Sequence, residues 1–201
     1  LDTTKPLITY EANGLNPSVN NTYWHINEFL VNISQTELHF GNATFNLLNS
    51  STANINGTVG AIRAINFTSL ADGVYRLNVT IIDLAMNSNA SEQRTFTIDT
   101  TKPLISYEAN GLHSIVNNTY LNTSVLRVNV SYTDTNFANV TFNLLNSSTA
   151  NINGTLGTAS TSRAINFSGL ADGVYRVNLS GFDLGNNSNA SEQRTFTIDT
   201  T

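Results

Sequence analysis

Few residues in this 201-residue chain could do catalytic or metal chemistry. Cysteine is absent, which excludes disulfides, thiol catalysis and zinc–thiolate sites. The only histidines are His25, His39 and His113. With only three histidines, the sequence contains no recognisable Ser-His-Asp triad and no recognisable set of histidine metal ligands. We therefore do not expect an enzyme.

Asparagine is the abundant residue that can be chemically modified. Of 31 asparagines, 18 begin the sequon Asn-x-Ser/Thr, in which x is not proline. The Ser and Thr content of the chain would give roughly 7 by chance. Dense sequons without cysteine favour an archaeal surface protein over a disulfide-bonded eukaryotic secreted one. We therefore expect N-linked glycans on several of the following residues: Asn20, Asn32, Asn42, Asn49, Asn56, Asn66, Asn78, Asn89, Asn117, Asn122, Asn129, Asn139, Asn146, Asn153, Asn166, Asn178, Asn186 and Asn189.

The sequence consists of two copies of one unit. Residues 1–97 align with residues 98–197 with 66 identities, if a three-residue insertion is placed near Thr158–Thr161. Residues 198–201 then repeat the opening of the unit, so we expect a piece of a longer tandem array. Each histidine aligns with an asparagine of the other copy, which argues against a histidine site built into the repeat.

The residue pattern of each copy predicts β-strands rather than helices. Apolar and polar residues alternate along 126–132 and 175–179, the period of a half-buried strand. Asn-Gly and Asp-Gly pairs between such segments indicate turns. About seven short strands in each copy predict an all-β fold of two tandem immunoglobulin-like β-sandwiches. We place them at residues 1–98 and 99–201 and expect them to stack end to end.

One motif supports this fold prediction. Leu70–Tyr75 and Leu170–Tyr175 each contain an Asp-Gly turn followed by a tyrosine that enters a strand. This is the layout of a tyrosine corner, in which the phenol binds nearby backbone.

With this corner, the chain resembles the bacterial and archaeal Ig-like repeats of large cell-surface proteins. The matching segments are the Asp-Thr-Thr-x-Pro opening, the Leu-x-Asp-Gly-x-Tyr corner and an Asp-Leu-x-x-Asn turn at 83–87 and 183–187. Met86 departs from the Gly that is usual in that turn. The resemblance covers all 201 residues and implies a sandwich fold at a cell surface.

Aspartates suggest a calcium site at the junction of two copies. Asp99 lies in the linker, and Asp134 and Asp183 are expected at strand ends that face it, with Asp72 of the preceding unit nearby. Oxygen ligands from several loops suit calcium, and several relatives are thought to use linker aspartates this way. The alternative is that these aspartates only cap turns by accepting backbone hydrogen bonds.

Charge and hydropathy exclude two classes of partner. Nine basic residues against 14 acidic ones provide no cationic surface for nucleic acid. No apolar run approaches the ~20 residues of a membrane span. We expect a structural repeat protein of an extracellular filament, sheath, stalk or surface layer, whose partners are further copies of itself. The alternatives are the stalk of an adhesin and the spacer of a secreted enzyme, with the active domain outside this segment.

Strand alternation predicts which way the asparagines point. Asn129, Asn166 and Asn178 each lie between two inward-facing apolar residues. Their side chains should therefore face solvent, as a glycan requires.

Overall fold

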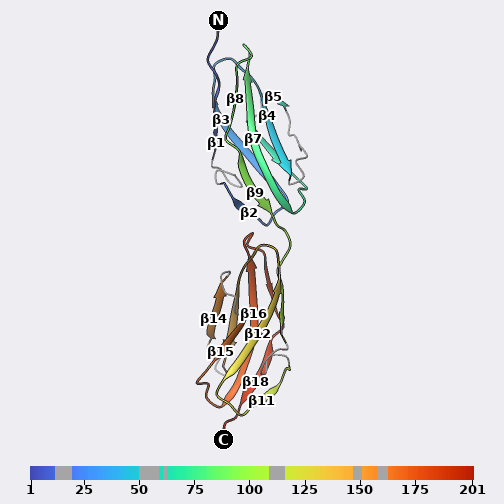
Figure 1. Ribbon diagram of the computed structural model, residues 1–201, viewed down its shortest axis with the longest axis vertical. Helices are drawn as coiled ribbons and strands as arrows, with labels where there is room; N and C mark the ends of the chain where they lie inside the picture. Colours follow the sequence, from blue (N-terminus) through green and yellow to red (C-terminus); the bar gives the residue numbers. More distant parts are fainter. Residues whose placement is uncertain (12–19, 50–58, 61–62, 109–115, 147–150, 158–162) are drawn as a thin grey trace. The chain divides into compact units, whose positions relative to one another are not determined.

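The computed structural model describes residues 1–11, 20–49, 59–60, 63–108, 116–146, 151–157 and 163–201. Within these ranges every regular element is a β-strand (Figure 1). The chain divides into two compact units, residues 1–101 and 102–201. No helix in the described part of the chain is long and apolar enough to cross a membrane.

The first unit is a sandwich of two sheets. One is three-stranded in the order β1-β3-β6, and the other has the order β2-β9-β7-β4-β5 with β8 added beside β7. All pairs are antiparallel except β2 with β9. The strands are β1 (Leu7–Tyr10), β2 (Thr22–Trp24), β3 (Phe29–Thr36), β4 (Phe40–Asn49), β5 (Val59–Gly60), β6 (Ala64–Phe67), β7 (Gly73–Asp83), β8 (Ser88–Ala90) and β9 (Arg94–Ile98).

The second unit repeats this topology. Its sheets have the orders β10-β12-β15 and β11-β18-β16-β13-β14, with β17 beside β16. The strands are β10 (Leu104–Tyr107), β11 (Thr119–Leu121), β12 (Leu126–Thr133), β13 (Phe137–Leu145), β14 (Asn151–Gly157), β15 (Ala164–Phe167), β16 (Gly173–Asp183), β17 (Ser188–Ala190) and β18 (Arg194–Ile198). The chain is therefore two tandem immunoglobulin-like β-sandwiches.

The described residues form nine strand segments in each unit, which correspond to the expected seven or so if the divided first and last strands are each counted once. The difference lies at the first and last strands. The first strand divides between the sheets, because β1 pairs with β3 and β2 pairs with β9. The last also divides, because β8 and β9 each pair with β7.

Alternating side chains build a separate core in each unit. Along β7 every second side chain from Tyr75 to Asp83 is buried, and β16 shows the same pattern from Tyr175 to Asp183. Phe29, Phe45 and Phe96 fill the first core with leucine, valine and isoleucine. Trp24 packs against this core, with its ring 5.9 Å from that of Phe29 in an edge-on arrangement.

The tyrosine corner is present in both units. The Tyr75 hydroxyl donates to the carbonyl of Ala71 at 2.8 Å, and Tyr175 makes the equivalent bond to Ala171 at 3.0 Å. Gly73, which follows Asp72 in the turn, has φ = +152°, a conformation that side-chain-bearing residues rarely adopt. The sequence motif therefore predicts this corner correctly.

Candidate functional site

Acidic residues lie around the β7–β8 turn of the first unit. Asp83 ends β7 and is 2% exposed. Its carboxylate accepts from the backbone N–H of Asn87 at 2.8 Å and from the Asn87 amide at 2.8 Å. The same amide donates to the carbonyl of Asp2 at 3.1 Å. Asp83 thus caps the turn and, through Asn87, holds the N-terminal segment against it.

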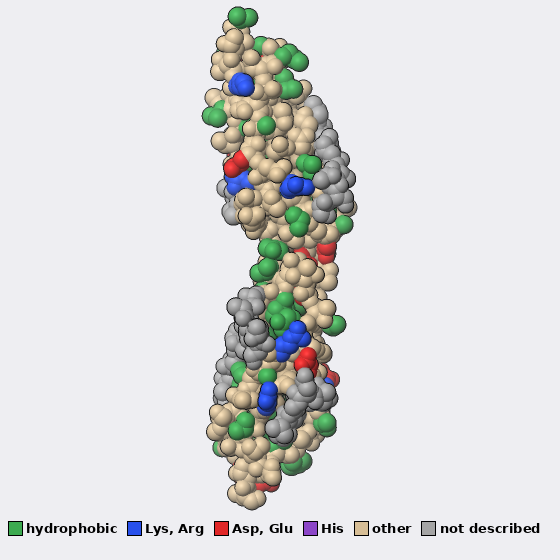
Figure 2. All heavy atoms as spheres, in the orientation of Figure 1, with side chains coloured by type: hydrophobic (Ala, Val, Ile, Leu, Met, Phe, Trp, Pro, Cys, Tyr) green, Lys and Arg blue, Asp and Glu red, His purple; other side chains and the backbone are tan. Residues whose placement is uncertain are grey.

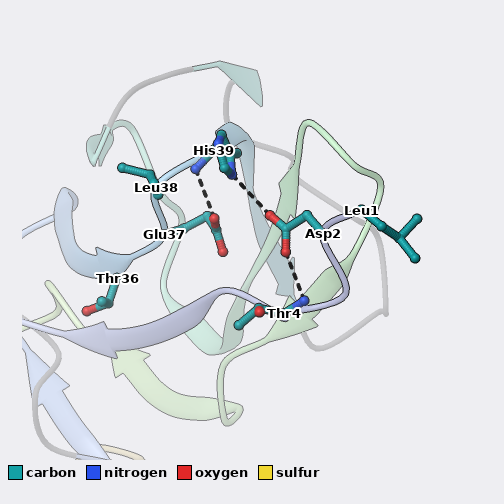
Figure 3. A pocket seen from close by; sticks show the side chains of 7 residues that line it. All are labelled: Leu1, Asp2, Thr4, Thr36, Glu37, Leu38 and His39. Atoms are coloured by element: carbon teal, nitrogen blue, oxygen red, sulfur yellow. Dashed lines mark hydrogen bonds and ion pairs between the residues drawn. The ribbon is translucent and has the colours of Figure 1, made fainter.

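A second group of polar side chains lies beside this turn. Donor atoms of Asp2, Glu37 and His39 all lie within 4.8 Å of one another. The Asp2 carboxylate accepts from Thr4 N–H at 3.0 Å and contacts His39 Nδ1 at 3.1 Å. Glu37 accepts from His39 N–H at 2.9 Å (Figure 3). These residues and Leu1, Thr36 and Leu38 line an open hollow of about 500 Å³.

The electrostatics of this group favour a charged Asp2. The Thr4 hydrogen bond, and then the contact with His39, hold the pKa of Asp2 below its ordinary value. Its side chain is 23% exposed and that of His39 is 56% exposed, so both groups are accessible from solvent.

In the second unit, Asp134 and Asp183 both bind nearby backbone. Asp134 accepts from Asn136 N–H at 2.7 Å. The Asp183 carboxylate accepts from the N–H of Asn187 at 2.8 Å and from its amide at 2.7 Å. The two side chains act as turn caps and also fit the oxygen ligands that calcium uses.

Asp99 lies in the first unit, and Asp134 and Asp183 lie in the second. Asp99 N–H donates to the Trp24 carbonyl at 2.8 Å, and its carboxylate accepts from Thr101 N–H at 3.2 Å. The calcium site composed of Asp99, Asp134 and Asp183 stays a prediction.

Asp72 holds the linker that leaves its own unit. One oxygen accepts from Thr100 N–H at 3.0 Å and from the Thr100 hydroxyl at 2.8 Å. The other accepts from the Thr101 hydroxyl at 2.7 Å. Asp172 makes the equivalent contacts to Thr200, at 2.9 and 2.7 Å. We call this arrangement the linker clamp, and it accounts for the repeated Asp-Thr-Thr sequence.

The sequon asparagines fall into three groups by exposure. Seven are exposed: Asn20, Asn66, Asn117, Asn122, Asn166, Asn186 and Asn189. Eight are half-buried: Asn32, Asn42, Asn49, Asn78, Asn89, Asn139, Asn146 and Asn178. Asn129 is buried. Asn56 lies outside the described residues, and of Asn153 only the backbone is described.

Asn129 corrects the expectation that mid-strand sequons face solvent, because it is only 6% exposed. It lies on β12, which is flanked on both sides by β10 and β15. The Arg127 side chain, two residues earlier on the same strand, donates to its Oδ1 at 3.2 Å. Residues 128 to 130 are all buried, so the burial pattern of β12 departs from simple alternation at Asn129, beside Arg127. Asn166 is exposed as expected, and Asn178 is half-buried.

Two of the three histidines can be placed. His25 and His39 are exposed, and His113 lies outside the described residues. The sequence analysis missed the cluster of Asp2, Glu37 and His39. The repeat alignment contains the signal, because Asp2 and Glu37 align with Asp99 and Asp134.

Charged groups elsewhere are sparse. On the face drawn in Figure 2, a few basic and acidic side chains lie on a mainly neutral surface in each unit. The pairs of Arg94 with Glu92 and of Arg194 with Glu192 recur in the two copies. This surface suits hydrogen bonding rather than electrostatic capture of a partner.

No family model matches the chain, and no curated protein does. Among solved structures, the fibronectin(III)-like modules of Clostridium thermocellum CbhA align with 96% of this chain and 93% of theirs, at 14% identity and a TM-score of 0.49. A solved chain from a 1.5-MDa bacterial ice-binding adhesin aligns over 100% of this chain and 67% of the solved chain, at 13% identity and a TM-score of 0.43.

Proposed function

We propose that this chain is a structural repeat segment of an extracellular filament, sheath, stalk or surface layer. In this role each sandwich is a spacer, further copies follow it end to end, and N-linked glycans cover part of its surface. No catalytic step is assigned to it.

The linker clamp is the observation that carries this proposal. A spacer must direct the chain that leaves it, and here the equivalent aspartates Asp72 and Asp172 bind the segment that follows the last strand of each unit. Three hydrogen bonds from two consecutive threonines to Asp72 restrict the directions the linker can take. Such a repeated device suits a chain of serially connected sandwiches.

The accessible asparagines support the second part of the proposal. Asn20 and Asn117 are exposed, and each uses its Oδ1 to accept a backbone N–H, from Thr95 at 2.6 Å and Thr195 at 2.7 Å. An amide held through its oxygen keeps its nitrogen available for a glycan. A hydrated sugar layer over a neutral surface resists proteolysis and adhesion.

The location is tested by immunogold electron microscopy of the source cells, with antibodies raised against the 201-residue chain. Label along extracellular filaments or over the cell envelope is expected. Label confined to the cytoplasm would overturn the proposal, and label on stalks that end in a distinct tip would identify the adhesin alternative.

The glycans are tested by mass spectrometry of peptides from the native protein. Asn166 and Asn186 are exposed and should be modified in part or all of the molecules, whereas the buried Asn129 should be bare. The chain made in a bacterial cytoplasm serves as the unmodified reference of 21.8 kDa. A native chain with no modified asparagine would remove the glycans without removing the spacer role.

A further inference from the structure

We propose that Asp2, Glu37 and His39 form a binding site for a transition-metal ion of the Zn²⁺ class, present in the first unit and lacking in the second. This inference does not depend on the spacer role. It concerns a nitrogen-containing donor set that differs from the all-oxygen calcium set predicted at Asp99, Asp134 and Asp183.

The donor atoms are already gathered. One atom from each side chain lies within 4.8 Å of the other two. His39 Nδ1 and Asp2 Oδ2 are 3.1 Å apart, which matches the separation of two donors that bind one ion at about 2.0–2.2 Å each. Asp2 and His39 point toward each other across the hollow (Figure 3). The Glu37 carboxylate supplies the third donor of the set.

Backbone contacts orient the two carboxylates. Thr4 N–H binds Asp2 Oδ1 and leaves Oδ2 facing the imidazole. His39 N–H binds Glu37 Oε1 and leaves the second oxygen of Glu37 as a ligand. Contacts of this kind reduce the conformational entropy that a flexible carboxylate loses when it binds an ion.

The imidazole offers its Nδ1 to the ion. This nitrogen faces Asp2 Oδ2 at 3.1 Å. An imidazole binds a metal through a nitrogen that carries no proton, so with the ion at Nδ1 the single ring proton lies on Nε2.

The hollow is open to solvent. A site with three protein ligands and free access leaves a fourth position for water, as in tetrahedral zinc sites that exchange ligands. We therefore expect a reversibly bound ion rather than one that is needed for folding.

The imidazole nitrogen determines which metal ions the site prefers. Zn²⁺, Ni²⁺ and Co²⁺ bind imidazole nitrogen well, whereas Ca²⁺ prefers oxygen ligands alone. At the positions equivalent to Glu37 and His39, the second unit has Asp134 and Asn136. An amide is a weak ligand for Zn²⁺, so the second copy lacks the donor that gives the first its selectivity.

The test is titration of the chelator-treated full chain with Zn²⁺ by calorimetry, and with Co²⁺ by visible absorption. Leu1 is acetylated, so that its α-amine cannot act as a ligand. One ion per chain is expected, with an absorption band typical of bound Co²⁺.

Two variants provide the matched comparison. His39→Asn places the second unit's residue in the first and should weaken Zn²⁺ binding at least tenfold. His25→Asn makes the same chemical change at an exposed histidine outside the cluster and should bind as the parent does. Circular dichroism without metal verifies that both are folded. Unchanged Zn²⁺ affinity in His39→Asn, or no binding by the parent, overturns the proposal, and so does equal loss in His25→Asn.

Calcium serves as a second probe. If the parent binds Zn²⁺ through His39, then His39→Asn should leave any Ca²⁺ response of the chain unchanged. Equal loss of Zn²⁺ and Ca²⁺ binding would show an unselective acidic cluster and would also overturn the proposal.

Discussion

Tyr10 and Tyr107 are equivalent residues whose hydroxyls connect the two sheets of their units. Tyr107 lies on β10 in the three-stranded sheet and donates to the carbonyl of Val177 on β16 at 2.9 Å. It also binds the Glu192 carbonyl at 3.1 Å, and the Arg194 guanidinium lies 4.4 Å from its ring centre. Tyr10 makes the corresponding contacts around Arg94. Each tyrosine hydroxyl therefore links the two sheets of its sandwich.

Tyr107→Phe should lower the free energy of unfolding by about 1 kcal/mol at pH 7.5, because it removes the part-buried hydrogen bond to Val177 and keeps the ring. Urea unfolding measures this loss. The exposed Tyr120 offers the matched control, since Tyr120→Phe should change stability by less than about 0.5 kcal/mol. Equal effects of the two substitutions would contradict a connecting role for the Tyr107 hydroxyl.

The same tyrosine predicts a pH dependence. Burial raises the pKa of Tyr107 above its ordinary value, and the hydrogen bond with Ser191 offsets this only in part. A group with a raised folded-state pKa contributes stability that is intact below its unfolded value of about 10 and is lost as pH rises above it. The parent should therefore lose stability in urea unfolding as pH rises above about 10, and Tyr107→Phe should lose less.

At the residue scale, the sequence predicts the direction in which a side chain points better than it predicts how deeply that side chain is buried. Period two correctly places Asn129, Asn166 and Asn178 out of phase with the core. Their exposure differs because it depends on neighbours that are distant in the sequence. Asn129 is covered through Arg127 on the central strand β12, whereas Asn166 lies on the edge strand β15. No local pattern distinguishes a central strand from an edge.

At the scale of elements, the linker clamp joins the turn before β7 to the segment after β9. Partial burial alone would raise the pKa of Asp72, but hydrogen bonds from Thr101 and Thr100 outweigh it and hold the pKa below its ordinary value. A group with a lowered folded-state pKa contributes stability above its unfolded value, about 3.9, and loses it as pH falls through the folded one. The clamp should thus persist at neutral pH and open only in strong acid.

Asp72→Ala should release the linker without unfolding the sandwich. Amide hydrogen exchange at Thr100 and Thr101, followed by NMR, should accelerate at least tenfold, while amides of β7 keep their protection. Thr101→Val removes a single hydrogen bond to Asp72 and should give a smaller acceleration. If exchange at Thr100 is the same in the parent and in Asp72→Ala, the carboxylate does not hold the linker.

The short strands show where the alternation of apolar and polar residues fails to predict secondary structure. β2 and β11 have three residues each, too few to display a period, and both pair in parallel with the last strand of their unit. Their position is set by side-chain contacts such as that of Asn20 with Thr95 N–H, which the sequence does not reveal. The longer alternating strands β7 and β16 follow the predicted pattern closely.

At the scale of the whole molecule, the two units have separate cores. Leu47 on β4 and Leu144 on β13 occupy equivalent positions, and both are fully buried. Leu47 packs only in the first core and Leu144 only in the second, and the two clusters share no residue. Because stability in tandem repeats is close to a sum over units, damage to one core should leave the other intact.

Leu47→Ala and Leu144→Ala should each destabilise their own unit by about 2–5 kcal/mol, the usual result of truncating a fully buried leucine. Trp24, the single tryptophan, packs against the first core, so its fluorescence reports that unit alone, while circular dichroism reports both. In urea, Leu47→Ala should shift the fluorescence transition to lower concentration. Leu144→Ala should leave the fluorescence transition in place and add an early step to the circular dichroism curve. A fluorescence shift of equal size in both variants would mean that the two sandwiches unfold as one cooperative body.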